Sequence, residues 1–214
     1  MDLPLSVGYR DQLQPDAVIH MNGTRVVAEG KTLYEHTMDK KLLKRLLAFG
    51  KERGIALGVT MENGDYYTAP EEVERIDVLR WGETSRHFED PMKLLELPVR
   101  TLAYIGGPDR VRELEEHFPE CKFFMFAGKT GADVVENEAS KAEGLKRLCE
   151  YYGIDLSQTV AFGDSMNDFE IVSRAGIGIA MGNSVEELKA AADYVTDPID
   201  RDGVWNACRH FGWI

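Results

Sequence analysis

From residue 140 onward, segments with a helical pattern and segments with a strand pattern follow one another in strict alternation. The pattern predicts helices at 140–152, 169–174, 184–192 and 203–211, and strands at 160–162, 177–180 and 194–196. Strands that alternate with helices are joined by right-handed crossovers and form a parallel sheet. We therefore expect an α/β fold with a Rossmann-like parallel sheet in this part of the chain.

The middle of the chain lacks this alternation. Its clearest element is a helix at 39–53, with leucines on one face, Asp39 to cap its start and Gly54 to end it. Asn22-Gly23 is a strong turn signal just before this region. We assign residues 1–23 and 137–214 to a Rossmann-like core and residues 24–136 to an inserted α+β domain.

The charge and the cysteines limit the classes of partner. A net charge of -12 argues against nucleic acid or an anionic membrane surface as a partner. The 3 cysteines are far apart and odd in number, so they suit neither a disulfide framework nor a metal site. No apolar run is long enough to span a membrane. These features predict a cytoplasmic protein, and they do not indicate an oligomeric state.

The stretch Val160–Asp168 has the strongest chemical signal. Val160, Ala161 and Phe162 suit a buried strand, and Gly163 is followed by a polar loop with Asp164, Asn167 and Asp168. Loops that leave the carboxyl ends of strands bind ligands in open α/β sheets. Carboxylate oxygens there suit Mg²⁺, although Ser165 and Asp168 also have the spacing of a helix cap.

Lys141 provides a second signal, because it lies in the first turn of a helix, next to the expected N-cap Ser140. A lysine there adds its charge to free backbone N–H groups and forms an anion site. A phosphate-binding cation and a metal-binding carboxylate are parts of a phosphoryl-transfer site. Asp164 would bind Mg²⁺, and Asn167 would contact the phosphate or orient Lys141. Asp168 would be a second metal ligand, would fix its neighbour, or would only cap the helix.

Several motifs together resemble one family. In chain order they are Asn22-Gly23, Ser140-Lys141, Gly163–Asp168, Gly176–Gly178, Ala180–Asn183 and Asp202–Val204. This order is similar to the Cof-type branch of the haloacid dehalogenase-like (HAD) hydrolases. The resemblance implies a Rossmann-like core with an inserted cap domain, Mg²⁺ dependence, and phosphatase activity on small phosphorylated metabolites such as sugar phosphates. It assigns Lys141 as the catalytic phosphate lysine, Asp164 as the metal aspartate, and Asn167 as a phosphate contact.

The sequence departs from this family at its start, where the nucleophilic Asp-x-Asp-Gly-Thr motif is missing. That motif forms an aspartyl-phosphate in the family. We expect the nucleophile to lie upstream of Met1, so that the core sheet is N-terminally incomplete and strand 17–21 cannot reach strand 160–162. Without the nucleophile, we expect the 214-residue chain alone to be nearly inactive. Asp200-Arg201-Asp202 matches the Asp-x-Asp pattern of the missing motif. However, Pro198 interrupts any strand before it, so a turn fits this stretch better than a nucleophile motif. The alternative hypothesis is a non-catalytic remnant that binds phosphate and metal.

Overall fold

The computed structural model describes residues 12–126 and 128–214, and the chain divides into two compact units. We call Ala17–Glu35 with Glu138–Ile214 the core unit. The inserted unit comprises His36–Asn137 together with the described residues up to Asp16. Residues 24–35, assigned above to the inserted domain, group with the core unit, whereas residues 12–16 and 137, assigned above to the core, group with the inserted unit.

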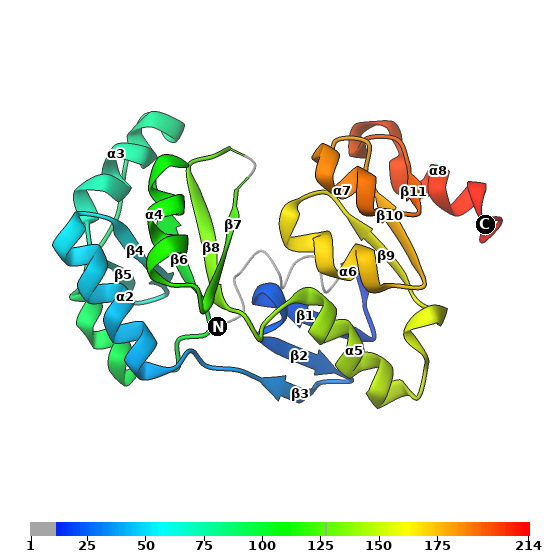
Figure 1. The fold of residues 1–214 in the computed structure, drawn as a ribbon, viewed down its shortest axis with the longest axis horizontal. Helices are drawn as coiled ribbons and strands as arrows, with labels where there is room; N and C mark the ends of the chain where they lie inside the picture. The colour runs from blue at the N-terminus through cyan, green and yellow to red at the C-terminus, as the bar shows by residue number, and fades with distance from the viewer. Residues whose placement is uncertain (1–11, 127) are drawn as a thin grey trace. The chain divides into compact units, whose positions relative to one another are not determined.

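The core unit contains the expected parallel sheet (Figure 1). Its strands are β9 (Val160–Gly163), β10 (Ile177–Ala180) and β11 (Tyr194–Val195), in the order β11-β10-β9, with Ile177 opposite Val160. The helices of this part are α5 (Lys141–Tyr152), α6 (Phe169–Arg174), α7 (Glu186–Ala191) and α8 (Gly203–His210). The predicted alternation of strand and helix is confirmed, with α7 starting later and ending earlier than expected.

A second, antiparallel sheet in the core unit explains why residues 24–35 belong there. β1 (Ala17–His20), β2 (Arg25–Ala28) and β3 (Lys31–Glu35) pair in chain order. Helix α5 packs against this sheet: a Cβ on Gly144 would lie 2.6 Å from Ile19 Cγ2, and the Arg147 guanidinium lies 3.6 Å from the centre of the Tyr34 ring. These long-range contacts hold the β1–β3 sheet against α5, and no local sequence pattern indicates them.

The two sheets of the core unit do not share a strand. Among the strands of residues 12–126 and 128–214, β9 pairs only with β10, so β9 ends the parallel sheet on its other side. β1 lies in the antiparallel sheet instead. This agrees with the expectation that the strand at 17–21 does not reach the strand at 160–162.

The inserted unit is built on a five-stranded antiparallel sheet in the order β5-β4-β6-β8-β7. Its strands are β4 (Ala56–Met61), β5 (Gly64–Tyr67), β6 (Leu102–Ile105), β7 (Cys121–Met125) and β8 (Gly131–Glu136). Its helices are α2 (Lys40–Arg53), α3 (Pro70–Trp81) and α4 (Asp109–His117), and a short 3₁₀ helix covers Pro91–Glu96. β4 and β5 form an antiparallel hairpin across Glu62-Asn63-Gly64.

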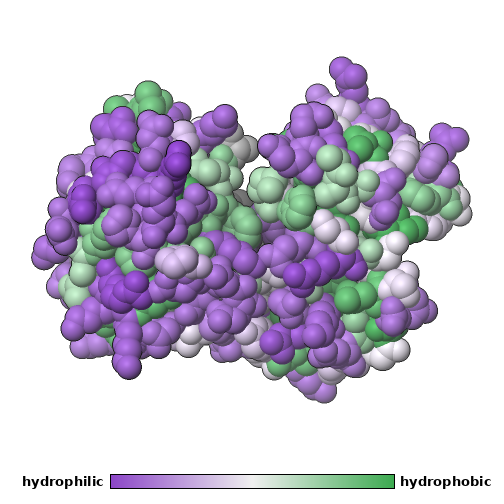
Figure 2. Space-filling view, viewed as in Figure 1, coloured by the Kyte–Doolittle hydropathy of each residue, from purple (hydrophilic) through white to green (hydrophobic). Residues whose placement is uncertain are grey.

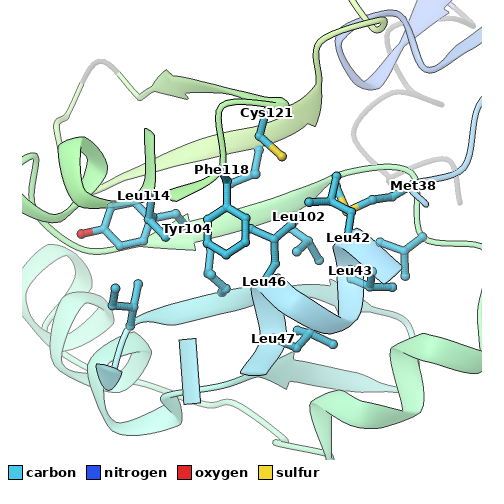
Figure 3. Packing of buried hydrophobic residues seen from close by; sticks show 14 of the residues in the cluster. Met38, Leu42, Leu43, Leu46, Leu47, Leu102, Tyr104, Leu114, Phe118 and Cys121 are labelled. Carbon is cyan, nitrogen blue, oxygen red and sulfur yellow. The ribbon is translucent and has the colours of Figure 1, made fainter. Parts of the chain in front are cut away.

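Alternation along the strands divides the apolar side chains of this sheet between its two faces. On one face, Leu57 and Tyr104 pack with leucines of α2 and α4, as Figure 3 shows for Leu42, Leu46, Tyr104 and Leu114. On the other face, Ala56 packs with Tyr67 of β5 and with Val73 of α3. Each fully buried leucine stabilises the fold by roughly 1.5–3 kcal/mol relative to its exposed state.

In the view of Figure 2, hydrophilic side chains cover most of the visible face of each unit, and apolar side chains form smaller patches among them. No helix in the part of the chain that the structure describes has both the length and the apolar character needed to cross a bilayer.

Candidate functional site

The loop after β9 carries Asp164 at the carboxyl end of the parallel sheet, where the sequence places it. Asp164 is exposed, and the chain then turns through a 3₁₀ segment, Met166–Asp168, into α6. The turn is so tight that a Cβ on Gly163 would lie 2.5 Å from the Cβ of Asp168. Only glycine fits at this close approach, and it allows Asp168 to fold back under the strand end.

Asp168 is buried and connects the loop to helix α5. Its Oδ2 accepts hydrogen bonds from the backbone N–H of Asp164 at 3.1 Å and of Ser165 at 3.3 Å. Its Oδ1 lies 2.5 Å from Nζ of Lys141. These contacts fix the neighbours of Asp168, and the contact with Ser165 is also that of a capping box at the start of the 3₁₀ segment.

Lys141 is the first residue of α5, as predicted, and its side chain is 31% exposed. Ser140 caps the helix, since its Oγ accepts a hydrogen bond from the backbone N–H of Glu143 at 3.2 Å. The predicted cation and the predicted carboxylate loop are therefore brought together, although they come from segments 27 residues apart. An ammonium has three N–H donors, so Lys141 can bind Asp168 and an anion at once.

Asn167 lies in the same loop, with its side-chain amide held at both ends. Its Oδ1 accepts a hydrogen bond from Ser165 Oγ at 2.5 Å, and its Nδ2 donates one to Asn22 Oδ1 at 3.0 Å. The sequence indicated Asn22 as a turn residue and as part of a family motif, but not as a contact of the site. Its contact with Asn167 joins residues 145 positions apart, and sequence spacing alone does not reveal it.

A cavity of about 240 Å³ opens beside Asp164. Its polar lining is formed by Asp164, Asp168 and Asn183, and apolar side chains including Phe162, Met181 and Val204 complete it. Asn183 ends the motif Ala180–Asn183, and its Oδ1 accepts a hydrogen bond from the backbone N–H of Ile199 at 3.0 Å. The arrangement within the core unit thus offers a carboxylate, an ammonium and amide groups around one loop.

Comparison with known proteins identifies the family. A family model for haloacid dehalogenase-like hydrolase matches residues 6–208. This chain is a HAD-like hydrolase. It is 30% identical over 209 residues to the protein named putative phosphatase YkrA of Bacillus subtilis (strain 168), and the match covers 95% of this chain and 79% of YkrA.

Two further relatives of the HAD-like chain are phosphatases. The HMP-PP phosphatase of Klebsiella pneumoniae (strain 342) is 25% identical over 194 residues, which cover 88% of this chain and 68% of that protein. The solved structure of a HAD subclass IIB sugar phosphatase matches with a TM-score of 0.84 and 27% identity, covering 99% of this chain and 82% of that chain. These matches confirm the Cof-type HAD resemblance, a core with an inserted cap domain, and membership of an enzyme family of phosphatases.

The Asp200-Arg201-Asp202 stretch of the HAD-like chain forms a turn. Ile199–Arg201 is a short 3₁₀ helix that follows Pro198, and Asp202 has a left-handed backbone with φ 57 before α8 begins. Both aspartates are exposed. A nucleophile of this family stands at the end of a buried strand, and this loop does not provide such a position.

Proposed function

We propose that this chain acts in a Mg²⁺-dependent phosphatase for small phosphorylated metabolites, with sugar phosphates as the first class to test. One observation supports this most directly: Asp168 binds the ammonium of Lys141 and the backbone of the loop that presents Asp164. The buried carboxylate of Asp168 therefore contacts both the ammonium proposed to bind phosphate and the loop that carries the proposed metal ligand. The sugar phosphatase among the similar structures supports the choice of substrate class.

Lys141 and Asn167 would bind the phosphoryl group. A phosphate monoester is a dianion near neutral pH, whereas the whole chain has a net charge of -12, so local positive charge is required. The ammonium of Lys141 supplies it, and the first turn of α5 adds free backbone N–H groups. Asn167 adds an amide N–H donor whose orientation is set by Ser165 and Asn22.

The donor atoms beside the cavity fit Mg²⁺ and do not fit a metal that needs several protein ligands. Mg²⁺ keeps most of its waters and is bound by one or two carboxylates together with phosphate oxygens. Asp164 is exposed and lies in the cavity lining with Asp168. Within residues 12–126 and 128–214, no group of three or more His, Cys, Asp or Glu side chains is arranged to hold a metal. When bound, Mg²⁺ would neutralise charge that develops on the transferring phosphoryl oxygens.

The proposal assigns the nucleophile to an aspartate outside the 214 residues, as the family resemblance implies. The chain alone would bind a phosphate monoester but hydrolyse it very slowly. The alternative is a phosphate- and metal-binding protein that has lost catalysis. We also propose a cytoplasmic location, which the three free cysteines favour.

Two measurements test the proposal. Isothermal titration calorimetry of the 214-residue chain with inorganic phosphate should show binding, and the binding should be tighter when Mg²⁺ is present. Hydrolysis of p-nitrophenyl phosphate with Mg²⁺ should be barely detectable for this chain. It should appear in a longer protein that also includes the reading frame preceding the Met1 codon.

The outcomes separate the hypotheses. Binding without activity in the longer protein would favour the non-catalytic alternative. No phosphate binding by either protein would overturn both hypotheses. An active longer protein should next be assayed against a panel of sugar phosphates and other phosphorylated metabolites.

A further inference from the structure

The turn after β1 has an unusual backbone. The backbone angle φ is positive at three consecutive residues: 46° at Met21, 53° at Asn22 and 90° at Gly23. Left-handed backbone is easy for glycine, tolerated by asparagine, and unfavourable for methionine. Backbone strain of this kind persists where the surroundings hold it in place, and it gathers at functional sites.

The turn is held against the start of helix α5. Gly23 lies so close to that helix that a Cβ would be 1.9 Å from the backbone oxygen of Ser140, the residue before Lys141. Thr24 closes the turn, since its backbone N–H and its Oγ1 both donate to the carbonyl of Met21, at 3.2 Å and 2.9 Å. The packing with α5 thus fixes where the Asn22 side chain can lie.

The Asn22 side chain is directed into the site. Asn22 is only 8% exposed, and its Oδ1 accepts the hydrogen bond from Asn167 Nδ2 at 3.0 Å. Ser165 Oγ donates to Asn167 Oδ1 at 2.5 Å, so the Asn167 amide is held at both its oxygen and its nitrogen. The Nδ2 group has two N–H donors, and Asn22 accepts one of them.

We propose that Asn22 is a positioning residue for phosphate binding: it holds the Asn167 amide so that the second N–H donates to the phosphoryl group. The role rests on the proposed function. It differs from an ordinary turn-forming role, which needs only a residue that tolerates positive φ. It also explains why an asparagine, with an acceptor oxygen, occupies this buried position in a strained turn.

Asn22→Gly separates these two roles, because glycine adopts the left-handed backbone and lacks the acceptor oxygen. We expect the melting temperature to stay close to that of the wild type. We expect the Kd for inorganic phosphate, measured by titration in Mg²⁺ on the whole chain, to rise about tenfold, as for loss of one hydrogen bond to a charged group. The matched control is Asn63→Gly, at an exposed hairpin turn of the inserted unit, which should leave the Kd unchanged.

A double-mutant cycle with Asn167→Ala makes the test specific. If Asn22 acts through Asn167, the double variant should bind phosphate no more weakly than Asn167→Ala alone. Additive losses, or an unchanged Kd in Asn22→Gly, would overturn the positioning role while leaving the proposed function intact. Absence of phosphate binding in the wild type would overturn the proposed function and this role with it, so the two failures are distinguishable.

Discussion

Lys141 Nζ lies 2.5 Å from Asp168 Oδ1, and Asp168 is in turn hydrogen-bonded to the backbone of Asp164. Two segments of the core unit are joined by this contact, the first turn of α5 and the loop after β9. Because Asp168 is buried, its charge needs a partner, and Lys141 supplies it. The same lysine is the candidate phosphate ligand, so stability and ligand binding are linked at this residue.

Lys141→Met should weaken phosphate binding about tenfold or more, because a charge-assisted contact is lost. It should also destabilise the core unit by about 1–2 kcal/mol, a value reduced for the partial exposure of the lysine, because Asp168 is left without its cation. Titration with phosphate and urea unfolding check the two effects. Lys146→Met, an exposed lysine on the same helix, is the control and should change neither. Unchanged phosphate affinity in Lys141→Met would contradict the assignment.

Asp164→Asn should weaken the effect of Mg²⁺ on phosphate binding and leave the stability of the fold nearly unchanged. The side chain is exposed at the loop, so its substitution should alter the free energy of unfolding by less than about 0.5 kcal/mol. The enhancement of phosphate binding by Mg²⁺ should fall about tenfold or more, because a carboxylate ligand is replaced by a neutral amide. Asp200→Asn, at an exposed aspartate of the turn before α8, is the matched control and should keep the full Mg²⁺ effect. An equal loss in both variants would argue against Asp164 as a specific ligand.

Arg86 joins two buried carboxylates in the inserted unit. Its Nη1 lies 2.9 Å from Asp65 Oδ1, and its Nε lies 2.6 Å from Asp77 Oδ2. Arg86→Met should destabilise this unit by about 3 kcal/mol near neutral pH, because two buried carboxylates lose their cation. Arg75→Met, which removes an exposed guanidinium from a pair with Glu72, should have a much smaller effect. Thermal unfolding of both variants measures the difference, and equal effects would mean that the Arg86 network adds little.

The same network predicts how stability depends on pH. Burial alone would raise the pKa of Asp65, but hydrogen bonds from Thr60, the His87 backbone and Arg86 outweigh burial and lower it below the usual 3.8. A carboxyl with a lowered pKa in the folded state stabilises the fold above its ordinary pKa, and this contribution disappears as the pH falls through the lowered value. The inserted unit should therefore lose stability below about pH 4, and Asp65→Asn should flatten the loss. A stability profile that is the same in wild type and Asp65→Asn would contradict this.

Leu46→Ala should destabilise the inserted unit by roughly 2–5 kcal/mol, because the side chain is fully buried between α2 and the sheet and leaves a cavity (Figure 3). Leu79→Ala, at a position that is 69% exposed, is the control and should cost less than about 0.5 kcal/mol. Unfolding in urea, followed by a probe of each unit, measures both. A similar cost in the two variants would show that Leu46 is not part of a tightly packed core.

Elements specified by neighbouring residues were predicted well. The helix expected at 39–53 is α2, with Asp39 Oδ1 accepting from the backbone N–H of Lys41 and Leu42, and with Gly54 in the left-handed conformation that ends it. Ser140 and Gly153 delimit α5 in the same way. Caps, turns and apolar periodicity act over a few residues, so the sequence displays them directly.

The sequence by itself determined the strand and helix alternation of the core, the family, and the residue types around the candidate phosphate and metal site. Only the tertiary structure decided that residues 25–35 pack with α5, that Asp168 binds Lys141, and that Asn22 holds Asn167. The physical reason is distance along the chain. Local backbone preferences are set within a turn or two, whereas a buried carboxylate or amide finds its partner only after segments 27 or 145 residues apart have come together.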